Sequence, residues 1–146
     1  MWIPFFDSGL NRLENVQKQF LLFALRDLGW SNRFSLPPYK ERLLLLNMLP
    51  LSKRQELACL IFIHDVLNHR IRSEELSSQF IFRDSVYSLR YQTLLLVRNP
   101  RSRYVSNELM NRCSRLFNSY CSSSDLVFSR EAFKRAITIM LRLKLG

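Results

Sequence analysis

The sequence predicts a mostly α-helical fold: a single-domain bundle of five to six helices over residues 1–146, with one irregular or short extended segment around residues 80–105. Three observations predict it. Hydrophobic residues form 47% of the chain and aromatic residues 12%, which is enough for a folded core. Glycine is scarce, at 3 residues, and leucine is abundant, a composition that favours helices over β structure. Several segments also repeat apolar residues every three or four positions.

The first expected helix, between Leu10 and Trp30, is the longest segment with this periodicity. The run from Phe20 to Leu25 is apolar on every side, so we expect other segments to cover it and the helix to lie at the centre of the core. Gly29 is expected to end the helix. The apolar residues expected on its buried face are Leu10, Leu13, Val16, Phe20, Ala24 and Leu28.

Prolines bound the second expected helix. Proline is tolerated in the first turn, so this helix begins near Pro38, and it ends at about Met48 because Pro50 cannot continue it. The third expected helix begins at Ser52, which can cap it, and runs to about Asn68.

Serines mark the starts of the remaining helices. Ser73 precedes a short fourth helix, Ser106 a fifth helix that runs to about Cys121, and Ser129 the last one. Between the fourth and fifth helices, residues 80–97 lack helical periodicity and predict either extended segments, with one short hairpin, or a long packed loop. In the last helix the residues expected to face inward are Phe133, Ala136, Ile137, Met140 and Leu141.

Charge is the strongest compositional feature. The chain has 22 Lys and Arg against 12 Asp and Glu, a net charge of +10, which suits nucleic acid or another acidic surface. Tyrosines are interleaved among the arginines between Arg83 and Arg115. A guanidinium can pair with phosphate, and a tyrosine ring can stack on an unpaired base. The candidate nucleic-acid-binding residues are Arg90, Arg98, Arg101, Arg103, Tyr104, Arg112 and Arg115. The alternative is a solvated basic surface, and the pattern does not distinguish RNA from DNA.

The sequence offers no catalytic constellation, so we expect no enzyme, no cofactor and no metal site. His64, Asp65 and His69 could suggest acid–base chemistry, but a surface pair of Asp65 with His69 near a helix end is the expected arrangement. There is no Gly-rich phosphate loop. No pair of acidic residues follows an aromatic strand, as a two-metal polymerase site would require.

The cysteines and the apolar runs bear on location. Cys59 is expected to be a small buried residue, and Cys113 and Cys121 have no zinc-knuckle spacing. The three cysteines are odd in number and widely spaced, so a reducing, intracellular compartment (nucleus or cytoplasm) is expected. No apolar run reaches about 18 residues, so we expect no membrane-spanning helix and no membrane partner.

Several short motifs follow one another along nearly the whole chain. They include Leu13-Glu-x-Val-Gln-Lys-x-Phe20, Leu28-Gly-Trp30, Leu36-Pro-Pro-Tyr-x-x-Arg42 and Leu67-Asn-x-x-Ile71. In this order and spacing the chain resembles the C-terminal, post-palm and thumb-side region of reverse transcriptases from non-LTR (LINE-type, Jockey-like) retrotransposons.

The resemblance implies a function by position. In that family the catalytic aspartates of the RNA-directed DNA polymerase and the endonuclease both lie upstream of this region. It therefore implies a non-catalytic fragment with weak nucleic-acid binding, whose partners are RNA or DNA and the remaining reverse transcriptase domains. The alternative is a helical protein-interaction module without nucleic-acid affinity. A large exposed apolar patch on the first or last helix would favour this alternative, and a continuous basic groove would favour nucleic-acid binding.

Overall fold

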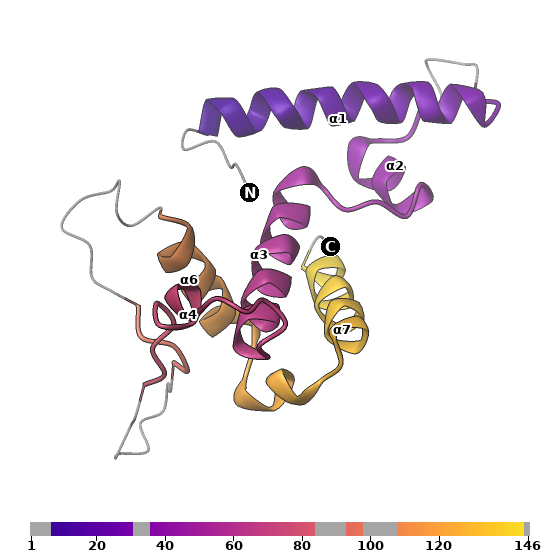
Figure 1. The fold of residues 1–146 in the computed structure, drawn as a ribbon. Helices are drawn as coiled ribbons and strands as arrows, with labels where there is room; N and C mark the ends of the chain where they lie inside the picture. The colour runs from indigo at the N-terminus through magenta and orange to yellow at the C-terminus, as the bar shows by residue number, and fades with distance from the viewer. Residues whose placement is uncertain (1–6, 31–35, 84–92, 98–107, 145–146) are drawn as a thin grey trace. The chain divides into compact units, whose positions relative to one another are not determined.

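The computed structural model describes residues 7–30, 36–83, 93–97 and 108–144 (Figure 1). These residues form six α-helices and one 3-10 helix and contain no named strand, so the prediction of a mostly α-helical fold is confirmed. In chain order the elements are α1 (Asp7–Asp27), α2 (Tyr39–Leu45), α3 (Leu51–Leu67), α4 (Glu74–Ser77), α6 (Leu109–Tyr120), η2 (Ser123–Val127) and α7 (Arg130–Leu143).

The chain divides into two compact units, residues 1–55 with 141–146 and residues 56–140. The first unit contains α1, α2 and the start of α3. The second contains the rest of α3 together with α4, α6 and η2, and α7 runs from the second unit into the last residues of the first. The expectation of one domain over residues 1–146 stays a prediction.

Polar residues on α1 fix how this helix packs in the first unit. Glu14 accepts hydrogen bonds from the Tyr39 hydroxyl and, at 3.0 Å, from the backbone N–H of Leu51. Gln17 donates to the carbonyl oxygen of Leu49 at 3.0 Å, and it is 6% exposed. These bonds turn one side of α1 toward α2 and the start of α3. The buried apolar side chains of this unit are Leu21, Leu25, Leu43, Leu49 and Leu141.

The expected buried face of α1 is wrong. Val16 is 66% exposed and Phe20 is 57% exposed, whereas Leu21 and Leu25 are almost fully buried. The helix carries apolar residues on two sides, and the hydrogen bonds of Glu14 decide which side faces inward. The expectation that Phe20 to Leu25 is covered on every side, at the centre of the core, is therefore wrong as well.

The end of α1 agrees with the prediction. Gly29 has a φ of +91°, its N–H donates to the carbonyl of Arg26 at 2.9 Å, and the N–H of Trp30 donates to that of Leu25 at 3.1 Å. This pair of bonds is the Schellman motif, which satisfies carbonyls that the helix leaves free.

The second unit is built on α3. Its buried apolar side chains come from α3, α6, α7 and the segments next to α4 and α6. They are Cys59, Leu60, Ile63, Val66, Phe80, Leu95, Cys113, Phe117, Phe133 and Ile137. A hydrogen bond of 2.9 Å from the Tyr120 hydroxyl to Glu56 joins α6 to α3. On the expected inward face of α7, Phe133, Ile137 and Leu141 are confirmed, because they are at most 1% exposed, whereas Ala136 and Met140 are half-buried.

Two of the four expected serine caps are confirmed. The expected cap Ser52 is wrong, because α3 begins before it, at Leu51. The hydroxyl of Ser73 accepts from the N–H of Leu76 at 3.3 Å, and that of Ser129 accepts from the N–H of Ala132 at 3.3 Å. The fifth expected helix, α6, begins at Leu109 with Glu108 at its N-cap, later than expected. The remaining cap, Ser106, lies outside the described residues.

The expected extended segment is present where the structure describes it. Phe82 and Leu95 form an isolated antiparallel bridge. On either side of it, the Arg83 N–H donates to the carbonyl of Leu94 at 3.0 Å and the Leu96 N–H to that of Ile81 at 2.8 Å. Residues 84–92 and 98–105 of this expectation lie outside the described residues. No described helix is long and apolar enough to cross a membrane.

Candidate functional site

The predicted basic site is only partly within the described residues. Arg90, Arg98, Arg101, Arg103 and Tyr104 lie outside them. The two remaining candidates are on α6, where Arg115 is exposed and Arg112 is half-buried. The two arginines therefore differ in their access to a ligand.

Arg112 lies against a pair of thiols inside the second unit. Its Nη2 is 3.6 Å from the Sγ of Cys59 on α3, and its Nε is buried without a hydrogen-bond partner among the described residues. The helical spacing of Leu109, Cys113, Leu116 and Phe117 predicts Arg112 on the opposite, outer face of this helix, and that prediction is wrong. A guanidinium held against Cys59 has fewer donors available for a phosphate.

Cys59 and Cys113 face each other between α3 and α6, and both are fully buried. Hydrogen bonds from the Cys113 thiol and the Arg112 guanidinium lower the pKa of Cys59, although burial opposes this shift. The hydrogen bond to Cys59 raises the pKa of Cys113, as does burial. The arrangement stabilises negative charge on Cys59, but a sulfur with no exposed surface is not accessible to a substrate.

Asn118 anchors the extended segment to α6. Its Oδ1 accepts from the Leu95 N–H at 2.8 Å, and its Nδ2 donates to the Leu95 carbonyl at 2.8 Å. A side-chain amide that makes both bonds replaces a strand neighbour for that residue. The same helical spacing predicts Asn118 on the outer face of α6, and no feature of the sequence indicates this role.

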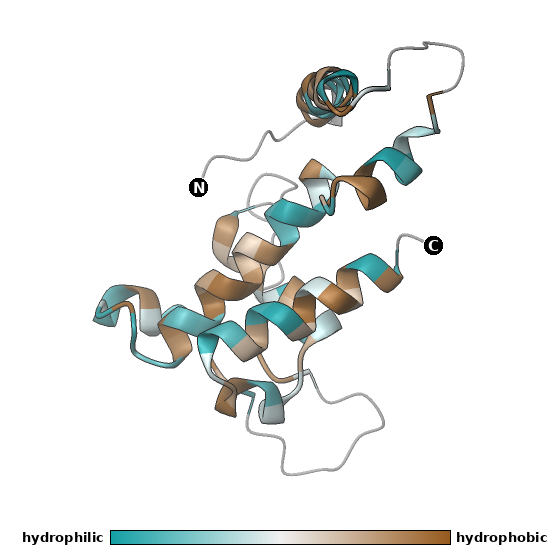
Figure 2. Cartoon of the chain, turned by 90° about the vertical axis from the view of Figure 1, so that its right-hand side faces the viewer, coloured by the Kyte–Doolittle hydropathy of each residue, from teal (hydrophilic) through white to brown (hydrophobic). Residues whose placement is uncertain are grey.

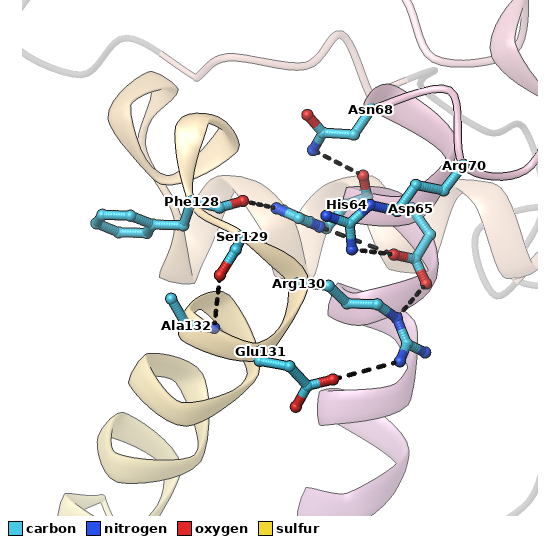
Figure 3. A network of polar contacts seen from close by, with 9 residues as sticks. All are labelled: His64, Asp65, Asn68, Arg70, Phe128, Ser129, Arg130, Glu131 and Ala132. Carbon is cyan, nitrogen blue, oxygen red and sulfur yellow. Dashed lines mark hydrogen bonds and ion pairs between the residues drawn. The ribbon is translucent and has the colours of Figure 1, made fainter.

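A network of polar contacts joins the C-terminal end of α3 to the start of α7 (Figure 3). His64 is fully buried, stacks on Phe133 with 4.3 Å between ring centroids, and has Nε2 at 3.1 Å from the carbonyl oxygen of Phe128. Asp65 is 8% exposed and accepts from the Nε of Arg130 at 3.0 Å. The network holds two helices together around one carboxylate.

The expected surface pair of Asp65 with His69 is not formed. The carboxylate of Asp65 has Arg130 at 3.0 Å and Arg70 at 3.7 Å as its ion-pair partners. His69 is exposed and has a φ of +54°, because it ends α3 as Gly29 ends α1. The N–H of His69 donates to the carbonyl of Val66 at 3.1 Å. The backbone of His69 therefore has the role of ending the helix.

Acidic side chains are withdrawn from the surface more often than basic ones. Glu14, Glu56 and Asp65 each bond to a neighbouring helix or segment of their own unit, and Asp125 bonds to Ser122. Among the described residues, twelve basic side chains are exposed against six acidic ones. The described surface is therefore basic, in agreement with the net charge of +10.

The outer side of α1 is apolar. Four side chains make a stripe along it, which is called here the outer stripe: Leu13, Val16, Phe20 and Phe23, with exposed fractions of 37%, 66%, 57% and 62%. In Figure 2, α1 is seen along its axis and has apolar residues on more than one side.

The first unit also has a cavity of about 430 Å³ beside α2. Tyr39 and Arg142 contribute polar groups to its wall, and the Arg142 Nη2 donates to the carbonyl of Asn47 at 3.4 Å. The apolar lining residues are Leu43, Leu44, Met48 and Pro50. The cavity can hold a small apolar group.

Within the described ranges, no three His, Cys, Asp or Glu residues gather as a metal site would need. No protein-family model matches the chain, and no curated protein or solved structure matches it significantly.

Proposed function

We propose that this chain is a non-catalytic, retroelement-derived module that binds RNA or DNA weakly, and that it resembles the C-terminal region of a non-LTR reverse transcriptase. The observation that carries this proposal is the basic surface. The described residues include twelve exposed basic side chains and only six exposed acidic ones. Glu14, Glu56 and Asp65 are used in internal hydrogen bonds. A surface of this kind attracts phosphates at long range.

The predicted contact residues come shortly after Leu95 in the sequence, and hydrogen bonds hold Leu95 against α6. Asn118 holds Leu95, three residues before Arg98, the first arginine of the densest basic stretch. Arg98, Arg101 and Arg103 are proposed to bind phosphates, and Tyr104 to stack on a base. The three cysteines are free thiols, and the proposed location is intracellular, in the nucleus or cytoplasm.

Salt dependence tests the proposal. The triple variant Arg98→Ala, Arg101→Ala and Arg103→Ala is compared with the wild type on single-stranded RNA and duplex DNA from low to physiological salt. Loss of three phosphate contacts is expected to reduce the slope of log affinity against log salt by about 2–3 units. Tyr104→Ala is expected to weaken binding to single strands more than to duplex.

A matched control separates local contacts from overall charge. Arg12, Arg72 and Arg135 are exposed residues, and changing all three to Ala removes the same net charge. We expect this control to change the slope by less than about 1 unit. Equal affinities and slopes for the wild type and the Arg98, Arg101 and Arg103 variant would refute the assignment.

A second candidate function is protein interaction through α1. The outer stripe supports it, because four neighbouring apolar side chains on one helix face form a contiguous patch, and such patches mark interaction sites. The partner is then another protein or the remaining domains of a reverse transcriptase. If the nucleic-acid test fails, this candidate takes first place.

A further inference from the structure

α1 presents two different faces. The inner face carries Gln17, Leu21 and Leu25, which are at most 6% exposed and pack within the first unit. The outer stripe, Leu13, Val16, Phe20 and Phe23, lies on another side of the helix. An amphipathic helix at the surface of a globular protein has one apolar side, which faces the core. The second apolar side of α1 therefore needs a separate explanation.

The spacing of the outer stripe is that of a helix–helix seam. Steps of three, four and three residues separate Leu13, Val16, Phe20 and Phe23, which are the a and d positions of a heptad. The stripe extends over about 15 Å of helix axis at 1.5 Å per residue. Side chains at these positions insert between four residues of a facing helix, so the natural occupant of this stripe is one α-helix.

The flank of the stripe carries positive charge. Arg12, Gln19 and Arg26 repeat every seven residues beside it, at the g positions, and all three are exposed. Neither Arg12 nor Arg26 forms an ion pair with a described residue. The other flank, at Gln17 and Ala24, borders the inner face and is at most half-exposed. Only the arginine side is open to charged groups of a partner.

The charges argue against a second copy of this chain as the occupant. In an antiparallel pair of α1 helices, Arg12 of one copy would lie near Arg26 of the other, and like charges at flanking positions repel. In a parallel pair, the arginines would meet the Gln17 and Ala24 flank, which offers no acidic group. The net charge of +10 opposes association of two copies further.

We propose that the outer stripe of α1 binds one amphipathic α-helix of another protein, with apolar residues at heptad spacing and acidic residues on the flank that meets Arg12 and Arg26. Apolar contacts at Phe20 and Phe23 supply affinity, and the two arginines select for acidic flanks. This inference rests on the protein-interaction function given above as the second candidate. It requires no role of Arg98, Arg101 or Arg103.

Two labelled helical peptides test it by fluorescence anisotropy with the full chain. Both have leucine at every a and d position; one has glutamate at its e and g positions, the other lysine. Repulsion among like flanking charges keeps each peptide from pairing with itself. We expect the glutamate peptide to bind at least tenfold more tightly than the lysine peptide at low salt, and the difference to shrink as salt is added.

Variants of the chain assign the contacts. Phe20→Gln with Phe23→Gln is expected to weaken glutamate-peptide binding at least tenfold while helix content and melting temperature stay close to wild type. Arg12→Glu with Arg26→Glu is expected to reverse the preference between the peptides. The matched control, Lys134→Glu with Arg135→Glu, makes the same charge change at exposed positions of α7 and is expected to preserve the preference.

Each of the other outcomes contradicts a specific claim. Stripe-dependent binding of both peptides with equal affinity would contradict the inference of an acidic partner and leave the protein-interaction function standing. Absence of stripe-dependent binding would contradict both the acidic partner and the protein-interaction function. A dimer in sedimentation equilibrium that Phe20→Gln dissociates would identify a second copy as the occupant. Stripe-dependent binding to phosphatidylserine vesicles without binding to either peptide would identify a membrane surface as the occupant instead.

Discussion

His64 has an incomplete set of hydrogen bonds. Its Nε2 lies 3.1 Å from the Phe128 carbonyl, and because a carbonyl only accepts, Nε2 carries the proton of the neutral ring. The other ring nitrogen, Nδ1, accepts no hydrogen bond, and neither does Oδ1 of Asp65, which lies 3.9 Å from Nδ1. Protonation of Nδ1 would supply the missing donor, but a charged ring cut off from water costs more, so burial lowers the pKa of His64.

We therefore expect acid to destabilise the fold through His64. The pKa of His64 in the folded protein is below its usual value, so the unfolded chain gains the proton first as pH falls. This contribution to stability is complete above about pH 6.5 and is lost as pH falls from there through the lowered pKa. The free energy of unfolding should decrease from pH 7.5 to pH 5.5, measured by urea denaturation.

NMR titration of the imidazole signals tests the lowered pKa of His64 directly. The chain has 2 histidines, and His69→Asn, which keeps a residue that tolerates a positive φ, leaves the signal of His64 alone and so assigns it. This signal should move only below about pH 6.5, the usual pKa of an imidazole. Titration of His64 at or above about pH 6.5 would contradict this account.

At the scale of the element, α1 shows how polar residues choose between two apolar faces. Periodicity identified the helix and its end at Gly29 but selected the wrong side for burial. The spacing of four residues between Glu14 and Lys18 predicts a pair on the helix surface. Instead Glu14 accepts from the N–H of Leu51, and Lys18 donates to Asn15 at 3.3 Å. The hydrogen bonds of Glu14 and Gln17 join residues that are 25 to 37 positions apart in the sequence, so a local pattern of apolar spacing does not predict them.

Alanine substitutions on adjacent residues of α1 measure the two faces. Leu21→Ala removes a fully buried side chain and is expected to cost about 2–5 kcal/mol of unfolding free energy. Phe20→Ala removes a larger but 57% exposed side chain and is expected to cost less than about 1 kcal/mol. Urea denaturation followed by circular dichroism gives both values. Similar losses for the two variants would mean that the outer stripe is covered in solution.

Three helices end with the same kind of backbone conformation. α1, α2 and α3 are each followed by a residue of positive φ: Gly29, Asn47 and His69. The sequence indicates the glycine readily, since glycine adopts this conformation without steric cost. Asn47 and His69 are less obvious because side chains with a Cβ reach this conformation at a cost of about 1–2 kcal/mol.

Over the whole molecule, the sequence predicted the number and type of helices better than the contacts between them. Helix starts at Ser73 and Ser129 follow from capping chemistry within four residues of chain. The thiol pair of Cys59 and Cys113 and the clamp by Asn118 join residues 23 to 54 positions apart, which single-sequence periodicity does not relate. The basic composition was visible directly, whereas the internal use of the acidic groups required the fold.

The expected absence of polymerase activity also concerns the whole chain. Phosphoryl transfer by two metal ions needs several carboxylates at one place, and the described carboxylates are dispersed or bonded to neighbouring segments. We expect no primer extension by the purified chain with Mg²⁺ and nucleotides. Extension at a rate above a heat-denatured control, retained through purification to constant specific activity, would contradict this expectation.

The clamp between Asn118 and Leu95 has a consequence for how the chain can change over evolutionary time. Its two hydrogen bonds use only the backbone of Leu95, and the Arg83–Leu94 bond closes the two ends of residues 84–92. Closing a longer loop costs only about 0.6 kcal/mol more for each doubling of its length. Insertions and exchanges between Arg83 and Thr93 can therefore accumulate while the bonds of Arg83, Leu95 and Asn118 are kept.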